Sequence, residues 1–246
     1  KYYYPVEFMA ALMTSVVEMP NKVAEYISVC RQMGIQILPP DINHGMYGFS
    51  VDNGAIRYAL SAIKSIGRPV IEGIVREREE HGEYTSLKTF VERNIDQINK
   101  RVVENLIKAG ALDCLEGNRK QKMTIYTQII DSINQDKKHT MAGQLSLFDI
   151  ASEEDKKEFE IRMPQAAEYP KEMILTFEKE VLGIYLSGHP LERYRNMMEK
   201  MISAKTSDGD KLYQMLIVRE ALLQKDEKKR LAQLKKWYSA RLLSVY

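Results

Sequence analysis

Residues 64–68 have the composition of a phosphate-binding turn. Ser65, Ile66 and Gly67 form a short turn between two helix-like segments, and the cations Lys64 and Arg68 stand on either side of it. A tight turn between two helices exposes its own amides and those at the start of the second helix, where the helix dipole also favours an anion. The sequence therefore predicts a binding site for one phosphate. An ordinary helical corner would show the same pattern, and that alternative stays open.

A second stretch, residues 99–113, repeats the order of helix, small-residue turn and apolar continuation. Two such units form the helix-hairpin-helix arrangement of DNA-binding proteins, which grips the phosphate backbone and reads no bases. The candidate backbone-binding residues of the second unit are Lys100, Arg101, Lys108 and Gly110. Because no basic residue follows the glycine in Ala109-Gly110-Ala111, this unit is also consistent with a mainly structural role.

A short apolar peptide at residues 144–148 has the character of a docking motif. It consists of Gln144, Leu145, Ser146, Leu147 and Phe148, and it lies between two charged stretches that cannot build a core around it. A glutamine followed by large apolar anchors suits a pocket on another protein. The alternative is that the apolar side chains fold back onto their own domain.

The sequence shows no cluster of residues for catalysis or metal binding. The aspartates Asp41, Asp52, Asp113 and Asp131 fall in separate predicted elements, whereas chemistry at paired metal ions needs clustered carboxylates. The four histidines are far apart, and the two cysteines have no partner at metal-ligand spacing. We therefore expect no catalytic residue, metal or cofactor in this chain.

The composition is typical of a soluble globular chain of one large or two small domains. The 246 residues are 44% hydrophobic and 28% charged, and the net charge is +2. No stretch approaches the roughly 20 apolar residues of a membrane span, and two unpaired thiols suit a reducing compartment. We therefore expect a cytoplasmic protein without a membrane partner. Because the sequence opens on Lys1 with no methionine and no helix cap, we also expect a piece of a longer protein.

Hydrophobic periodicity predicts a mainly α chain. The predicted helices cover residues 6–19, 22–33 (capped by Asn21), both sides of the turn at 65–67, 119–134 and 171–182. Residues 35–38 form a strand-like run that stops at Pro39-Pro40. Residues 48–51 and 55–59 flank the pair Asn53-Gly54, which tolerates positive φ, and so predict one small β-hairpin. Residues 151–164 are predicted to be a flexible linker, and residues 209–246 a basic C-terminal helix.

Several stretches resemble the alpha (catalytic) subunit of bacterial DNA polymerase III and occur in that family's order. They are residues 4–13 (YPVEFMAALM), 37–43 (ILPPDIN), 62–67 (AIKSIG), 99–101 (NKR), 109–113 (AGALD) and 182–191 (LGIYLSGHPL). The resemblance covers residues 1 to about 205. It departs from the family at Ser65, where a Gly-x-Gly turn is often found, and beyond residue 205, where an oligonucleotide-binding β barrel is expected.

The resemblance implies four regions. Residues 1–57 correspond to the end of the fingers domain, and residues 58–150 to a clamp-binding domain with tandem helix-hairpin-helix units. Residues 151–205 are then a linker and helix toward a missing OB domain, and residues 206–246 an atypical basic tail. The family carries an internal sliding-clamp peptide, whose pattern residues 144–148 match. Its catalytic aspartates, and the Mg²⁺ they hold, belong to a palm domain upstream of Lys1.

The implied function is that of a non-catalytic part of a replicative polymerase. Its partners would be double-stranded DNA, the sliding clamp (the beta subunit) and other replicase subunits. Two alternatives stay open: a free-standing helix-hairpin-helix protein of repair type with the peptide buried, and an all-helical interaction protein that does not contact DNA.

Overall fold

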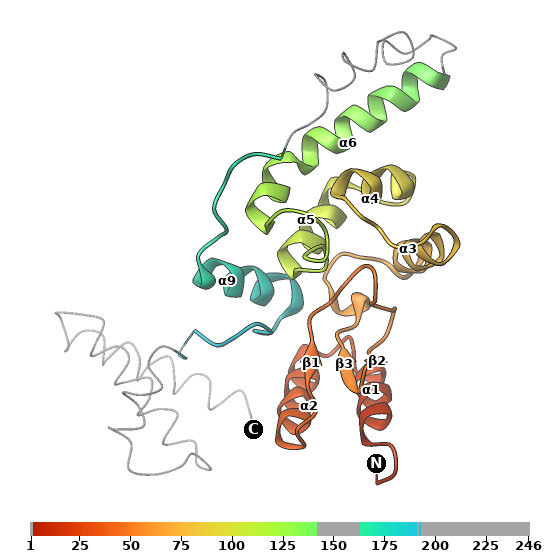
Figure 1. Cartoon of the computed structure of the whole chain (residues 1–246). Helices are drawn as coiled ribbons and strands as arrows, with labels where there is room; N and C mark the ends of the chain where they lie inside the picture. Colours follow the sequence, from red (N-terminus) through yellow and green to blue (C-terminus); the bar gives the residue numbers. More distant parts are fainter. Residues whose placement is uncertain (1, 142–162, 191, 193–246) are drawn as a thin grey trace, which may run out of the picture. The chain divides into compact units, whose positions relative to one another are not determined.

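The computed structural model describes residues 2–141, 163–190 and 192 (Figure 1). The chain divides into two compact units, Lys1–His189 and Pro190–Tyr246. All helices and strands with described bounds lie in the first unit.

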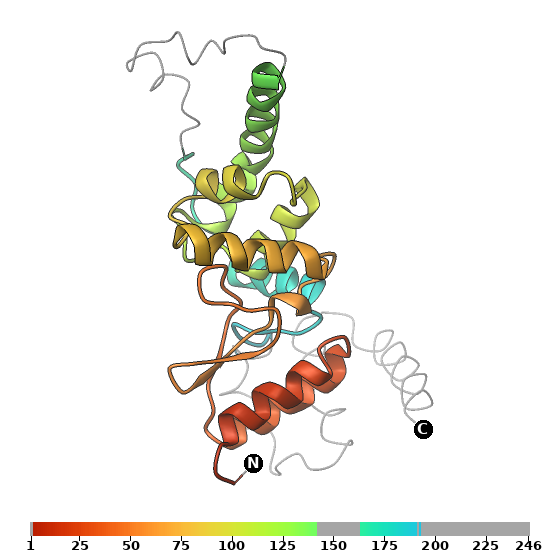
Figure 2. The same ribbon diagram turned by 90° about the vertical axis from the view of Figure 1, so that its right-hand side faces the viewer.

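Three short strands form a small mixed sheet at one end of the first unit, beside α1 (Pro5–Ser15) and α2 (Pro20–Gln32) (Figures 1 and 2). They are β1 (Ile37–Leu38), β2 (Ser50–Asp52) and β3 (Ala55–Arg57). The strand order is β1-β3-β2, with β1 parallel and β2 antiparallel to β3.

The β2–β3 hairpin confirms the turn predicted at Asn53-Gly54. Both residues have positive φ, 51° and 79°, which matches the twist that a two-residue hairpin needs. The sequence predicts β1 as a strand-like run but gives no partner for it. In the structure Ile37 pairs with Ile56 of β3. A turn motif cannot reveal this pairing, because parallel strands are joined by a long connection.

The predicted N-cap of the second helix is wrong. The sequence predicts Asn21 as the cap of a helix that starts at residue 22, whereas α2 starts at Pro20 and Met19 occupies the N-cap position. Proline suits the first helical position because the N–H that it lacks would have no partner there and its φ is already helical. The helix therefore extends back through Asn21 to the proline.

Six further helical segments lie beyond the sheet. They are the 3₁₀ turn η1 (Leu60–Ala62), α3 (Arg68–His81), α4 (Leu87–Asn94), α5 (Lys100–Ala109), α6 (Arg119–Met141) and α9 (Lys171–Leu182). The caps of α4 and α5 are side chains: Ser86 accepts from the Thr89 amide and Asn99 from the Val102 amide. The long helix α6 extends past the others, so its far end projects from the unit (Figures 1 and 2).

Helix α5 is central and packs against both α6 and α9 (Figure 1). Its buried apolar side chains are Val102, Val103, Leu106 and Ile107. Removing each from water is worth about 1.5–3 kcal/mol. One hydrophobic core contains side chains from Met9 to Ile184, on both sides of residue 57. The boundaries after residues 57, 150 and 205 stay predictions.

A buried arginine closes the connection between α5 and α6. Arg119 is 7% exposed, and its guanidinium binds the carboxylate of Asp113 at 2.6–3.0 Å and the Lys108 carbonyl at 3.2 Å. Gly110 ends α5 in the left-handed conformation, with φ of 80°. A Cβ at this glycine would lie 2.1 Å from Nη2 of Arg119, so the position requires glycine for both backbone and space.

The chain that precedes α9 returns to the start of α6. The Glu168 carboxylate accepts from the Arg119 amide at 2.9 Å, at the positive end of the α6 dipole. The side chains of Asn118 and Gln121 donate to the carbonyls of Ala166 and Pro164, both at 2.7 Å. Residues 164–168, which lead into α9, are therefore held against the start of α6.

The predicted fold class is confirmed over the described residues, which are mainly helical with a small β element. The predicted basic tail, and the predicted linker except for residues 163 and 164, lie outside the described residues. Among the helices that the structure describes, none has the length and apolar character needed to cross a membrane.

Candidate nucleic-acid interface

The predicted phosphate-binding turn connects η1 to α3. Ile63 and Ile66 are buried, whereas Ser65, Gly67 and Arg68 are exposed. Ser65 adopts a left-handed backbone, with φ of 64°, and reverses the chain there. Buried isoleucines on both sides thus anchor an exposed turn, here called the hairpin turn (residues 64–68).

The hairpin turn presents backbone amides at the start of α3. The amides of Val70 and Ile71 bond to the Gly67 carbonyl, so the helical hydrogen bonds begin there. In the described part of the chain, no acceptor bonds to the amides of Ile66, Gly67 or Arg68. Three successive free donors at a helix N-terminus are the groups that an anionic oxygen needs.

Arg68 is an exposed cation of this turn. Its side chain is 67% exposed and bonds to Glu72 Oε1 at 2.7 Å. Its guanidinium also lies 4.8 Å from the centre of the Tyr47 ring. An exposed i,i+4 pair of this kind is weak, so the guanidinium can exchange Glu72 for a phosphate at little cost.

Lys64 contacts α9 instead of standing free beside the turn. Its ammonium donates to the Glu180 carbonyl at 2.7 Å, and its amide donates to the Val181 carbonyl at 2.9 Å. Its own carbonyl accepts from the Asn105 side chain at 2.7 Å. Sequence reasoning could not anticipate these bonds, since Lys64 and Glu180 are 116 residues apart.

The second predicted unit is divided between the two ends of α5. Lys100 and Arg101 begin this helix, whereas Lys108 and Gly110 lie at its other end, about 12 Å farther along the axis. The four residues therefore do not form one site. Residues 110–118 make a long connection to α6, and the tight turn of this region is instead residues 95–99, between α4 and α5.

Lys108 and Gly110 are used inside the fold. The Lys108 ammonium is 14% exposed and lies 2.9 Å from Glu104 and 2.8 Å from Glu180. Burial alone lowers the pKa of Lys108, but the bonds to these two glutamates outweigh it and raise that pKa. The guanidinium of Arg119 occupies the space beside Gly110. Lys100 is half exposed, with Asp131 at 2.7 Å, and Arg101 is exposed.

Gly73 of α3 lies against Gln97 of the 95–99 turn, and the sequence patterns identified neither residue. A Cβ on Gly73 of α3 would lie 1.5 Å from Oε1 of Gln97 in the 95–99 turn. The absent side chain therefore lets that turn pack directly on α3. A glycine within an amphipathic helix is the signal that could have suggested such an approach.

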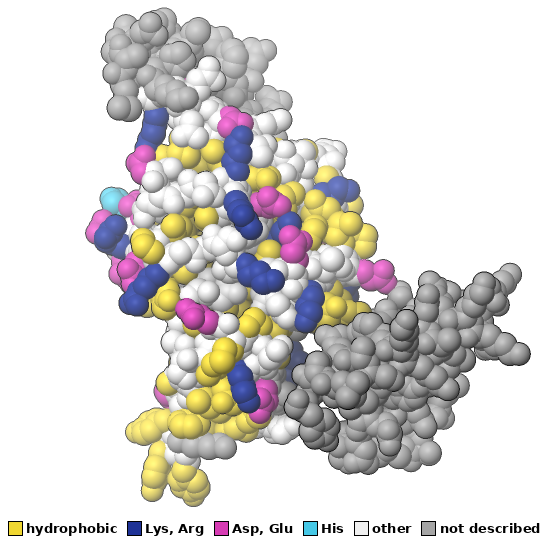
Figure 3. Space-filling view, turned by 180° about the vertical axis from the view of Figure 1, so that it is seen from behind, with side chains coloured by type: hydrophobic (Ala, Val, Ile, Leu, Met, Phe, Trp, Pro, Cys, Tyr) yellow, Lys and Arg dark blue, Asp and Glu magenta, His cyan; other side chains and the backbone are white. Residues whose placement is uncertain are grey.

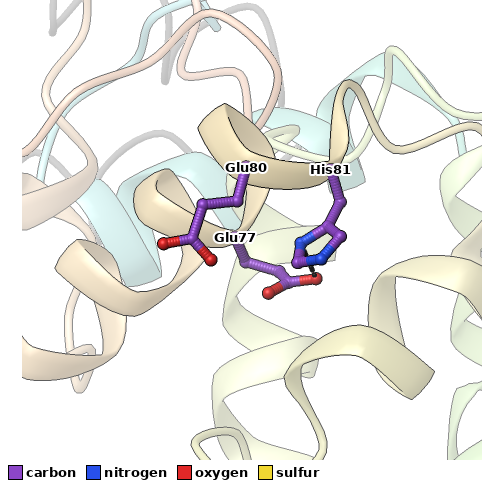
Figure 4. A group of neighbouring side chains, drawn as sticks. All are labelled: Glu77, Glu80 and His81. Carbon is purple, nitrogen blue, oxygen red and sulfur yellow. Dashed lines mark ion pairs between the residues drawn. The ribbon is translucent and has the colours of Figure 1, made fainter.

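The predicted aspartates and histidines are not gathered into one site. Asp41 accepts from the amides of Asn43 and His44, Asp52 binds Arg57, Asp113 binds Arg119, and Asp131 binds Lys100. One small cluster was not foreseen: Glu77, Glu80 and His81 share a face of α3 (Figure 4). The Glu77 carboxylate already binds Arg93 and His81, both at 3.0 Å, so ion pairing accounts for this cluster.

Lysine and arginine side chains do not gather into a single patch on the face seen in Figure 3. They alternate with acidic and hydrophobic side chains over the height of the first unit. The predicted docking peptide, Gln144, Leu145, Ser146, Leu147 and Phe148, lies outside the described residues.

Comparisons with known proteins agree with this geometry. A family model described as a helix-hairpin-helix motif matches residues 34–122, which include the hairpin turn, α3, α4 and α5 but not α9. The DNA polymerase III subunit alpha of Vibrio cholerae is 38% identical over 211 residues, or 85% of this chain and 18% of the relative.

Two further relatives carry the same name. The protein of Chlamydia pneumoniae is 34% identical and covers 89% of this chain, and that of Escherichia coli K12 is 36% identical and covers 82%. The matches span only 18% of the length of these relatives. The chain is thus a relative of the DNA polymerase III alpha subunits and corresponds to a segment of them.

Proposed function

We propose that this chain is the part of a replicative DNA polymerase that holds double-stranded DNA by its backbone and links the enzyme to its sliding clamp. The observation that supports DNA binding is the hairpin turn, where three free amides open α3 within a matched helix-hairpin-helix motif. The names of the relatives support a role in replication.

The amides of residues 66–68 would hold one phosphate, with Arg68 as the neighbouring cation. Amides and guanidinium groups recognise phosphate oxygens irrespective of the base sequence. Lys100 and Arg101, at the start of α5, are the candidates for a second phosphate. We do not propose Lys108 and Gly110 as DNA contacts. Lys108 is already paired with Glu104 and Glu180, and Arg119 occupies the space beside Gly110.

Clamp binding would come from residues 144–148. In sequence, Gln144 follows closely on Met141, the last residue of α6. Near the end of that helix, Lys137 binds Asp96 of the 95–99 turn at 2.8 Å, so in sequence the peptide follows the part of α6 that lies beside this turn. The Gln144 amide offers both a donor and an acceptor to a polar pocket, and Leu147 and Phe148 would fill an apolar one.

Catalysis would come from elsewhere in the longer polymerase. We propose that this segment binds no Mg²⁺ of its own and works with the catalytic part, with other replicase subunits and with the clamp's beta subunit. Replication of a bacterial chromosome would place it in the cytoplasm.

The test is the binding of the full chain to labelled duplexes of unrelated sequence, at several salt concentrations. Affinity should be similar for all duplexes and should fall steeply with salt. Arg68→Ala should weaken binding to all of them alike. Arg76→Ala is the matched control, since Arg76 is exposed on the same helix about 12 Å farther from the turn. Equal effects of the two substitutions would refute the assignment of this turn.

A further inference from the structure

Helix α9 holds the hairpin turn, although it lies outside the residues that match the helix-hairpin-helix model. The Lys64 amide and ammonium donate to the carbonyls of Val181 and Glu180 in the last turn of α9. The last carbonyls of a helix have no hydrogen-bond partner within the helix, and a cation beside them interacts favourably with the negative end of the helix dipole. Lys64 therefore satisfies the end of α9 and fastens the hairpin turn to it.

The same residue fixes how the chain enters the turn. Lys64 is bonded at its amide by α9 and at its carbonyl by Asn105 of α5. The next residue, Ser65, has the left-handed φ of 64°, a conformation that costs a non-glycine residue about 1–2 kcal/mol. Such a conformation persists only where surrounding contacts determine it, and here the contacts are those of Lys64.

Helix α9 is itself docked firmly on α5. Val181 and Leu182 are each 2% exposed, and Glu180 reaches Lys108 of α5 at 2.8 Å. The Lys108 ammonium also lies 5.6 Å from the centre of the Phe177 ring. The hairpin turn, α5 and α9 thus form one connected arrangement, in which Glu180 receives both lysines.

We propose that α9 is a working part of the duplex-DNA site and that Lys64 is a positioning residue that joins α9 to the hairpin turn. The inference rests on the proposed function and replaces the expectation that Lys64 contacts phosphate. In this arrangement the turn amides and Arg68 meet the DNA, while Lys64 holds them at the required geometry. By linkage, docking of α9 and binding of duplex strengthen each other by the same factor.

The experiment compares three variants of the full chain on a labelled duplex over a series of KCl concentrations. Lys64→Met keeps the apolar stem and removes the ammonium, and Arg68→Met does the same for the proposed phosphate contact. Lys22→Met is the control for net charge, because Lys22 lies on α2 and pairs there with Glu25.

The slope of log affinity against log salt separates the two roles. Each lost phosphate contact lowers that slope by about 0.9, which is the result expected for Arg68→Met. Lys64→Met should weaken binding on the order of fivefold at every salt concentration, as for one exposed hydrogen bond, and leave the slope unchanged. Lys22→Met should change neither quantity.

Hydrogen exchange supplies a second readout that does not depend on affinity. In the free chain, Lys64→Met should speed exchange of the amide at position 64. In the wild type, duplex should slow exchange of that amide and of the last turn of α9. An unchanged affinity in Lys64→Met, or a slope lowered as much as in Arg68→Met, would overturn the inference and leave the proposed function intact. A wild-type chain without salt-dependent duplex binding would overturn both.

Discussion

Lys64 and Lys108 show how one residue type takes different roles in neighbouring places. Both ammonium groups donate to Glu180: that of Lys64 to the backbone carbonyl of Glu180, and that of Lys108 to the carboxylate of Glu180. Arg68, only four positions from Lys64, is 67% exposed and stays available to a ligand. The difference lies in what packs against each side chain, and it decides which cations can reach DNA.

Gly110 provides a prediction at the scale of one residue. Gly110→Ala should destabilise the fold because it combines a left-handed backbone with a clash against Arg119. Gly34→Ala is the matched control: Gly34 follows the end of α2 with a similar φ, +74°, and the same pattern of backbone bonds, but nothing lies within 4 Å of its Cβ position. We expect Gly34→Ala to cost about 1 kcal/mol and Gly110→Ala about 1–3 kcal/mol more.

Urea unfolding followed by circular dichroism measures both costs. Equal losses in the two variants would show that Arg119 moves aside freely and that space at Gly110 does not matter.

At the scale of elements, the hairpin turn is stabilised by three helices. α3 continues from the turn, α5 contributes the Asn105 side chain, and α9 contributes two carbonyls. Gly73 lets the 95–99 turn pack on α3 and so brings the start of α5 near it. The proposed phosphate site on the hairpin turn is thereby held in place by the helices bonded to it.

The β2–β3 hairpin provides a prediction on pH. The bond from Arg57 holds the pKa of Asp52 below its ordinary value of 3.8. The folded state thus favours the carboxylate, so this contribution to stability is complete above pH 4 and disappears as pH falls through the lowered pKa. Asp52→Asn should cost about 1 kcal/mol at neutral pH, and the gap from wild type should close in acid.

Unfolding free energies between pH 2 and 7 test this directly. Asp131→Asn is a suitable control, because its ion pair with Lys100 is about half exposed and should matter less at neutral pH. A gap between Asp52→Asn and wild type that persists at pH 2 would contradict the role of Arg57.

At the scale of the whole molecule, α6 connects two kinds of contact. It packs on α5, and its second half pairs Asp131 with Lys100 and Lys137 with Asp96 of the 95–99 turn. Its end leads to the predicted docking peptide in the sequence (Figure 1). Under the proposed function, a segment that corresponds to 18% of its relatives would both bind the DNA backbone and dock on the clamp. The two functions would be separable by mutation.

The clamp provides the prediction at this scale. Leu147→Ala/Phe148→Ala should reduce binding of the full chain to the cognate sliding clamp by at least about tenfold, since a few buried anchors carry most of the energy. Gln144→Ala should also weaken it, and Ser146→Ala, within the same peptide, should have a smaller effect. Duplex affinity should be unchanged in all of them. Equal clamp binding by wild type and double variant, measured by surface plasmon resonance, would rule out this peptide.

The sequence by itself determined the local structure of this protein. Periodicity predicted most of the helices, from residues 6–19 to 171–182, but not α4, and Asn53-Gly54 predicted a hairpin, because these features depend on neighbouring side chains and on permitted φ values. The turn at residues 65–67 and its flanking cations were equally visible. The serine at position 65 was also visible in the sequence, whereas its left-handed φ of 64° was not predicted.

Only the tertiary structure decided what those residues contact. The parallel pairing of β1 with β3, the packing of Gly73 against Gln97 and the binding of Lys64 to Glu180 join residues far apart in the chain. No periodic pattern encodes such pairs, since each depends on how several helices pack together. The assignment of Lys64 to positioning and of Lys108 to the interior followed from that packing, because a cation's role depends on which acceptors lie within 3 Å of it.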